Sequence, residues 1–291
     1  MASYRVVVRD PGRDIEAFSA TRLSFEPQGP MKEFRRELSE TCRSLIAGHG
    51  ERLQAVYTSA VTERVDLENV LTYNLGTGAI SAAARHGLVL ERCFEPTGDT
   101  AHPHHHRYRL DTLDGCGEHW TADEVVGSVA LQAPLEAFRE PKAGHWWLLA
   151  ARAGVDVSRH HGAVPERYGL RVSVTPPHHW RGSLADLLKP LVDGLVSAMH
   201  AHDGPLMSIL ERAAVIHPEL TTAELQHHLT SPATPLGPTR LVVPWRHTLQ
   251  WLPADDHIVL LDARIETERR PGTVNADVHL VAPCPGSREP G

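Results

Sequence analysis

The succession of a strand and a helix over residues 168–202 constrains the fold of this chain more than any other feature. Apolar and polar residues alternate along Tyr168–Thr175, which is typical of a strand with one buried face. A helix is expected over Ser183–His202, because leucines recur at helical spacing and Ser183 can cap the first turn with Asp186 in the capping-box position. Pro190 should kink that helix. Such an order predicts an α/β protein.

Other segments of the chain repeat these two kinds of pattern. The expected helices and strands further along are Tyr4–Val8, Met31–Ala47, Leu53–Ser59, Trp146–Arg152, Thr222–Leu229 and His257–Ile265, of which the second and fifth are helices. Another helix should begin at Asp66, where acidic residues occupy the first turn. The predicted fold class is therefore α/β (α+β), a mixed sheet with flanking helices.

Two stretches share one order of parts. Residues 53–71 and 170–188 each run from a strand through a polar turn into a helix that opens with acidic residues and leucines. Either an internal duplication or the common grammar of α/β proteins accounts for this. We expect an N-terminal unit over residues 1–140, a C-terminal unit over 141–282 with an insertion at about 203–250, and a flexible tail over 283–291.

Composition narrows the setting in which the protein works. The net charge is −7, which argues against binding long nucleic acid through bulk electrostatics. Four scattered cysteines form no Cys-x-x-Cys pair, which suggests reduced thiols in the cytoplasm. The apolar runs are shorter than the ~20 residues of a membrane-spanning helix, so no membrane association is expected.

Clustered acids on one helix and beside one strand suggest a cation site. Asp186, Lys189 and Asp193 lie on neighbouring turns of the expected helix, and Asp255 and Asp256 precede the last strand. Mg²⁺ binds carboxylate oxygens and retains water, and two such ions can drive phosphodiester hydrolysis. The alternative is local: a cap, an ion pair between Lys189 and Asp193, and a solvated turn.

In this order of parts the chain resembles the RusA-type Holliday-junction resolvases. Members of that family have a strand, a helix opening with Asp-x-Asp-Asn-Leu-x-Lys-x-x-x-Asp-Ala-Leu, and an Asp-Asp pair before a later strand. The helix at Asp186–Asp193, which includes Lys189, and the pair Asp255-Asp256 fit this order. Aligning Lys189 and Asp193 with the family motif, however, places Ser183 and Ala185 at the two metal-binding aspartates.

The N-terminal half supplies the missing part of the pattern. Residues 66–71, Asp-Leu-Glu-Asn-Val-Leu, are close to Asp-x-Asp-Asn-x-Leu, but Thr72 stands in place of the lysine. The resemblance implies a RusA-like fold, with two such α/β units as one version of it. Neither half alone carries a complete motif.

Two functions follow from the resemblance. The sequence favours a non-catalytic binding or assembly protein that keeps a degenerate RusA-like fold and acts with a protein partner or further copies of itself. The alternative is a Mg²⁺-dependent, structure-selective endonuclease acting on branched or duplex DNA. Its metal ligands would be drawn from Asp66, Glu68, Asp186, Asp255 and Asp256, and its catalytic residues would be Lys189 and Asp193.

Histidines are numerous but lack the spacing of a structural metal site. A run at His102–His106 lies in a turn-rich stretch, and pairs recur at His160-His161, His178-His179 and His227-His228. Neither cysteine partners nor a His-Glu-x-x-His helix accompany them. We interpret them as loop histidines with adventitious metal affinity.

Overall fold

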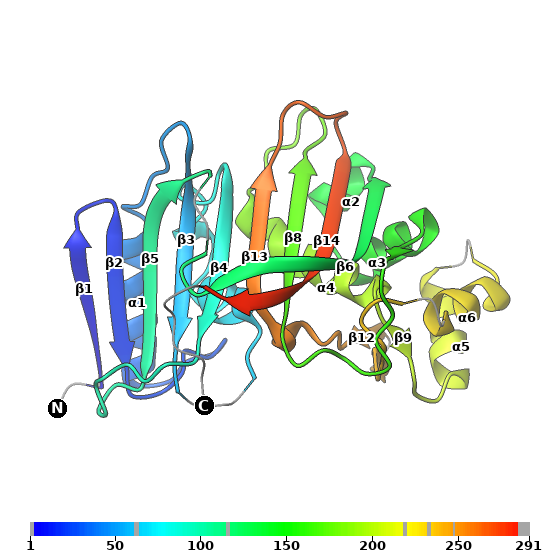
Figure 1. Ribbon diagram of the computed structural model, residues 1–291, viewed down its shortest axis with the longest axis horizontal. Coiled ribbons are helices and arrows are strands. Elements are labelled where there is room, and N and C mark those ends of the chain that lie inside the picture. The colour runs from blue at the N-terminus through cyan, green and yellow to red at the C-terminus, as the bar shows by residue number, and fades with distance from the viewer. Residues whose placement is uncertain are drawn as a thin grey trace.

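A ten-stranded mixed sheet organises the protein, and the α/β fold class is confirmed (Figure 1). The computed structural model describes residues 3–60, 64–114, 117–217, 220–231, 234–246 and 248–284. The strand order across the sheet is β1-β2-β5-β3-β4-β13-β8-β14-β6-β7. These strands are β1 Tyr4–Asp10, β2 Asp14–Ser19, β3 Glu51–Thr58, β4 Gly87–Cys93, β5 His104–Thr112, β6 Trp120–Gln132, β7 Asp156–Val157, β8 Tyr168–Thr175, β13 Ile258–Ile265 and β14 Thr273–Pro283.

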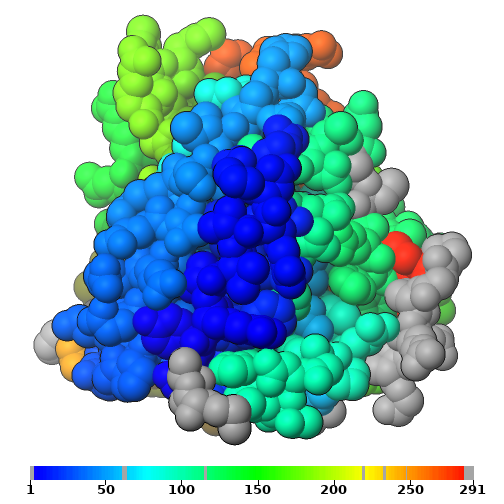
Figure 2. Space-filling model, turned by 90° about the vertical axis from the view of Figure 1, so that its left-hand side faces the viewer, coloured from blue at the N-terminus to red at the C-terminus, as the bar shows by residue number. Residues whose placement is uncertain are grey.

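Helices cover one face of this sheet (Figure 1). They are α1 Pro30–Cys42, the short α2 Leu135–Arg139, α3 Ala143–Ala153 and α4 Leu184–Ala198. On the opposite face, the ends of the long strands β6 and β14 bend across β13 (Figure 1). The edge strand β1 closes the sheet at one end of the molecule, beside α1 (Figure 2). No helix in the described ranges is long and apolar enough to cross a membrane.

The sheet consists of two halves with the same topology, joined where β4 pairs antiparallel with β13. Outward from this junction, β3 and β8 are parallel to their inner neighbours, and β5 and β14 are antiparallel to β3 and β8. The strands β2 and β6 follow, again antiparallel. In chain order β2, β3, β4 and β5 thus correspond to β6, β8, β13 and β14, which is the topology of an approximate two-fold axis between β4 and β13.

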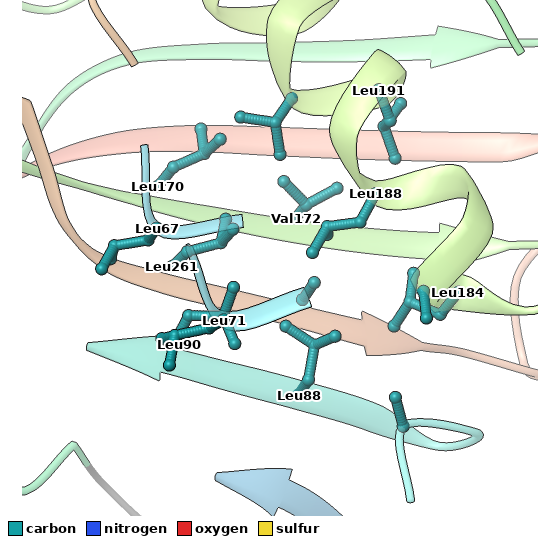
Figure 3. Packing of buried hydrophobic residues seen from close by; sticks show 14 of the residues in the cluster. Leu67, Leu71, Leu88, Leu90, Leu170, Val172, Leu184, Leu188, Leu191 and Leu261 are labelled. Atoms are coloured by element: carbon teal, nitrogen blue, oxygen red, sulfur yellow. The ribbon is translucent and has the colours of Figure 1, made fainter. Parts of the chain in front are cut away.

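Leucines that occupy corresponding positions in the two halves form the centre of the core (Figure 3). Leu53 of β3 pairs with Leu88 of β4, and Leu170 of β8 pairs with Leu261 of β13. The offset along the chain that relates Leu53 to Leu170 also relates the buried pairs Leu67 and Leu184, and Leu71 and Leu188. Burial of these side chains removes about 25 cal/mol of unfavourable hydration per Å² of apolar surface.

The insertion after α4 packs as a satellite against α3. It holds β9 Ala201–His202, α5 Met207–Ile216, α6 Thr222–Thr230, β10 Pro238–Thr239, β11 Val242–Trp245 and β12 Thr248–Trp251. Its small core joins Trp147 and Leu148 of α3 to leucines of α5 and α6. The predicted unit boundary near residue 140 lies between α2 and α3 and stays a prediction, and most of the predicted tail, residues 285–291, lies outside the described ranges.

Four local predictions were wrong, and one of them is the end of the helix expected over Ser183–His202: it ends at Ala198, and Ala201–His202 form β9. Residues 146–152, expected to be a strand, belong to α3, because a short apolar run does not distinguish a buried helix from a buried strand. His104–His106 are the first residues of β5 and not a loop, and the side chains of His104 and His106 are buried. The helix that begins at Pro30 ends at Cys42, five residues before the predicted end at Ala47.

Candidate functional site

Carboxylates from three separate segments meet beside α4. Asp66 and Glu68 follow β3 and precede a π-helical turn over Asn69–Tyr73. Asp193 lies on α4, one turn after Lys189, and Asp255 begins the short 3₁₀ turn Asp255–His257 that leads into β13. The segment after β3 and the entry to β13 meet here because α4 packs over the junction of the two halves, where β4 and β13 are paired.

Lys189 lies at the centre of this carboxylate cluster, defined as Asp66, Glu68, Asp193 and Asp255. Its Nζ donates to Asp193 Oδ1 at 2.6 Å and to Asp255 Oδ2 at 2.7 Å. It also lies 3.0 Å from Glu68 Oε1 and 3.4 Å from Asp66 Oδ2. One ammonium therefore faces four carboxyl groups, and with all of them ionised the cluster carries a surplus of negative charge.

Three members of the cluster are close enough to share a cation. Asp66, Glu68 and Asp255 each offer an oxygen, and these oxygens all lie within 4.8 Å of one another. Glu68 is fully buried, and its Oε2 accepts no hydrogen bond from the described residues. A buried carboxylate oxygen without a partner is costly, because its desolvation is not compensated. A cation at this position would remove that cost.

Burial and mutual repulsion change the protonation of these groups. Burial raises the pKa of Glu68 well above its usual range, against the opposing effect of Lys189. The pKa of Asp193 is raised to about 7, again mainly by burial. For Asp255, burial is outweighed by Lys189 and the pKa is lowered. Burial would lower the pKa of Lys189, but the carboxylates raise it well above its ordinary value, so the ammonium stays charged.

Asp186 and Asp256 were also predicted as metal ligands, and both lie outside the trio that can share a cation. Asp186 instead takes part in the cap that Ser183 forms on α4: the Asp186 backbone N–H donates to Ser183 Oγ, and the Asp186 carboxylate accepts from Ser183 at 2.7 Å and from Thr77 at 2.5 Å. Asp256 lies 3.9 Å from Nε2 of His257. The local role that the sequence offered for Asp186 is the one its contacts support.

A cleft opens from the cluster toward the insertion. It has a volume of about 850 Å³, and Lys189 and Asp193 form part of its wall. Further cationic side chains along it are Lys142 and Arg152, and Trp251 adds an aromatic surface. The cleft can therefore hold an anionic or ring-containing molecule against the cluster.

Sequence reasoning missed the neighbours that hold the entry to β13. His257 is buried, its Nδ1 donates to the carbonyl oxygen of Pro165 at 2.6 Å, and its Nε2 is in contact with the guanidinium of Arg64. Tyr168 donates from its hydroxyl to the carbonyl oxygen of Ala254 at 2.7 Å. These contacts join residues far apart in the chain, so no local pattern could have indicated them.

Comparison with known proteins identifies no relative of this chain. No family model matches the chain, no curated protein matches it, and no solved structure matches it.

Proposed function

We propose that this protein is a Mg²⁺-dependent nuclease whose metal centre is assembled from both halves of the chain. The observation that carries the proposal is the approach of Asp66, Glu68 and Asp255 around a buried oxygen of Glu68 that accepts no hydrogen bond within the described part of the chain. The sequence had favoured a non-catalytic protein, because Ser183 and Ala185 replace acids in the C-terminal half. The N-terminal half supplies the acids Asp66 and Glu68 at the same cluster.

The ligand set suits a hard divalent cation. Carboxylate oxygens are the ligands that Mg²⁺ and Mn²⁺ prefer, and Mg²⁺ is bound by few carboxylates and keeps several waters. Asp66 retains 26% exposure of its side chain, so solvent and substrate can reach this edge of the cluster, whereas Glu68 lies at its closed end. When bound, the cation would lower the pKa of a coordinated water and polarise a phosphoryl oxygen.

Lys189 would bind the phosphate group of the substrate, and Asp193 would orient Lys189. With a cation neutralising the carboxylates, the ammonium of Lys189 would become able to bind a phosphate oxygen in the adjoining cleft. Asp193 accepts a hydrogen bond from Lys189 at 2.6 Å, and this bond would keep the Lys189 side chain directed along α4. Lys142 and Arg152 extend the positive charge along the cleft, which a protein of net charge −7 needs in order to hold a polyanion locally.

A cleavage assay tests this proposal. Purified protein is incubated with end-labelled branched, duplex and single-stranded DNA in Mg²⁺, Mn²⁺ or EDTA. We expect cutting of at least one substrate with either cation and none in EDTA. Asp66→Asn and Glu68→Gln should abolish cutting with their folding intact, whereas Asp186→Asn, the matched control on the same helix as Lys189, should cut normally. Intact substrates under every condition would overturn the proposal.

A binding or assembly role is the second candidate, and exposed apolar side chains of the insertion favour it. The insertion exposes large apolar side chains, with Met207 72%, Val215 80% and Trp245 53% exposed. Where such side chains form one contiguous patch, they often mark a protein-binding surface. In that case Lys189 would be the permanent counter-ion of the cluster, and neither Mg²⁺ nor Mn²⁺ would bind to the purified protein.

A further inference from the structure

The carboxylate cluster is unevenly divided between the two halves of the sheet. Asp66 and Glu68 come from the N-terminal half, between β3 and β4. Lys189, Asp193 and Asp255 come from the C-terminal half, between β8 and β13. An approximate two-fold axis between β4 and β13 relates these halves, so every residue of the cluster has a counterpart on the other side of the axis.

The counterparts follow from strand register and chain offset. When the two halves are aligned so that Leu53 matches Leu170, the same sequence offset aligns Asp66 with Ser183 and Glu68 with Ala185. The same offset aligns Thr72 with Lys189 and Gly76 with Asp193. In the strands next to the axis, Leu88 corresponds to Leu261, which places Ala82 on Asp255. Neutral residues therefore stand at all five counterpart positions, which are Thr72, Gly76, Ala82, Ser183 and Ala185.

Contacts at the counterpart location fit this loss of charge. Ser81 donates to Ser183 at 3.1 Å, and Thr77 donates to the carboxylate of Asp186 at 2.5 Å, so that the start of α4 is joined to the 3₁₀ turn Thr77–Ala79. The carboxylate of Asp186 has two hydroxyl donors and needs no cation. Ala185, in the place that Glu68 has in the cluster, is a buried methyl group.

We infer that the chain carries one catalytic metal centre in a framework with room for two, and that it cuts one strand for each substrate it binds. The inference rests on the proposed function. Each cut is a hydrolysis: the oxygen of one water bonds to phosphorus, one P–O ester bond breaks, and the departing oxygen takes up a proton. The products are one phosphomonoester and one hydroxyl, and the residues that the structure describes form no second centre of this kind for the opposite strand.

Cation binding tests the number of centres without relying on activity. Mn²⁺ binding to the full chain is measured by titration calorimetry and by the electron paramagnetic resonance of free Mn²⁺. Because one centre can hold two ions, the number of bound ions does not by itself give the number of centres. The comparison of two variants does. Asp66→Asn should weaken all specific Mn²⁺ binding by about tenfold or more, and Asp186→Asn, in the counterpart region, should leave it unchanged. Specific binding that survives Asp66→Asn but is lost with Asp186→Asn would overturn the inference.

Plasmid cleavage tests the consequence. Supercoiled DNA is expected to become nicked circles that accumulate first, with linear DNA appearing only late from independent nicks. Linear DNA formed together with nicked circles from the outset would contradict a single cut for each binding event. Specific Mn²⁺ binding that depends on Asp66 but comes with no cleavage of any substrate would refute the nuclease function, while leaving the single metal centre in place.

Discussion

Removing the ammonium of Lys189 is the sharpest perturbation of the carboxylate cluster. In Lys189→Met the four acids lose the donor that lies 2.6–3.4 Å from each of them. Breaking a buried ion pair costs about 3–5 kcal/mol, because the remaining charge is left uncompensated. We expect a loss of that order in the free energy of unfolding at pH 8 in EDTA.

The pH dependence of this loss has a defined sign. Burial already raises the pKa of Glu68 and Asp193, and the loss of Lys189 should raise it further. A carboxyl group whose folded pKa exceeds its unfolded pKa destabilises the fold increasingly as the pH rises from the unfolded to the folded value, and by a constant amount above the folded value. The loss should therefore shrink as the pH falls to 5, where these groups take up protons.

A divalent cation should substitute for the missing ammonium. Mn²⁺ at about one hundred times its dissociation constant would return about 2.7 kcal/mol to Lys189→Met. Urea unfolding followed by tryptophan fluorescence measures each value, with Lys142→Met as the control, since Lys142 is 75% exposed at the rim of the cleft. A Lys189→Met variant within about 1 kcal/mol of the wild type at pH 8 in EDTA would refute the reasoning.

Three further predictions concern the fold. Burial lowers the pKa of His106 to about 3, so between pH 6.5 and 3 the unfolded chain takes up a proton that the folded protein does not. At pH 5 this difference lowers the free energy of unfolding by about 2 kcal/mol. In His106→Leu, the drop in urea-measured stability between pH 7 and pH 5 should therefore be smaller. Gly194→Ala would place a Cβ 2.3 Å from the Cβ of Trp146, so calorimetry should show a loss of about 1–3 kcal/mol, and an unchanged stability would mean that α3 and α4 separate easily. Leu188→Ala should cost about 2–5 kcal/mol in urea unfolding, since Leu188 is fully buried; a cost below about 1 kcal/mol would contradict the packing in Figure 3.

The sequence predicted best where a local pattern has a single physical cause. The strand Tyr168–Thr175 was predicted to the residue, because apolar and polar residues alternate from Leu170 to Thr175 with the period of a strand. The cap at Ser183 was predicted as well, since a serine followed three residues later by an acid satisfies the first free N–H groups of a helix. Neither prediction needed knowledge of distant contacts.

Predictions that depended on contacts between distant segments were less specific, because local sequence patterns do not show such contacts. Asp66, Glu68 and Asp255 were candidates for one site, but only the pairing of β4 with β13 places their segments beside α4. Nothing local shows that Lys189 contacts acids from both halves. For Asp186 the sequence offered both a cap and a metal ligand, and the choice depends on Thr77, which lies far away in the chain.

The internal duplication was one of two explanations for the similar order of residues 53–71 and 170–188. Sequence alone could not separate them, because α/β proteins commonly repeat a strand and a helix. Matching strand order, matching pairing directions and matching leucine positions now favour duplication. The edge strands β1 and β7 depart from it, since β1 precedes β2 in the chain whereas β7 follows β6.

A crystal structure of the protein grown with Mn²⁺ would test the central claim most directly. Anomalous scattering locates the ion without reference to activity. We predict a peak at coordination distance from carboxylate oxygens of Asp66, Glu68 and Asp255, with Lys189 displaced toward the cleft. Crystals soaked in millimolar Mn²⁺ that show no peak there, with Lys189 still bonded to the four acids, would contradict a metal centre shared by the two halves.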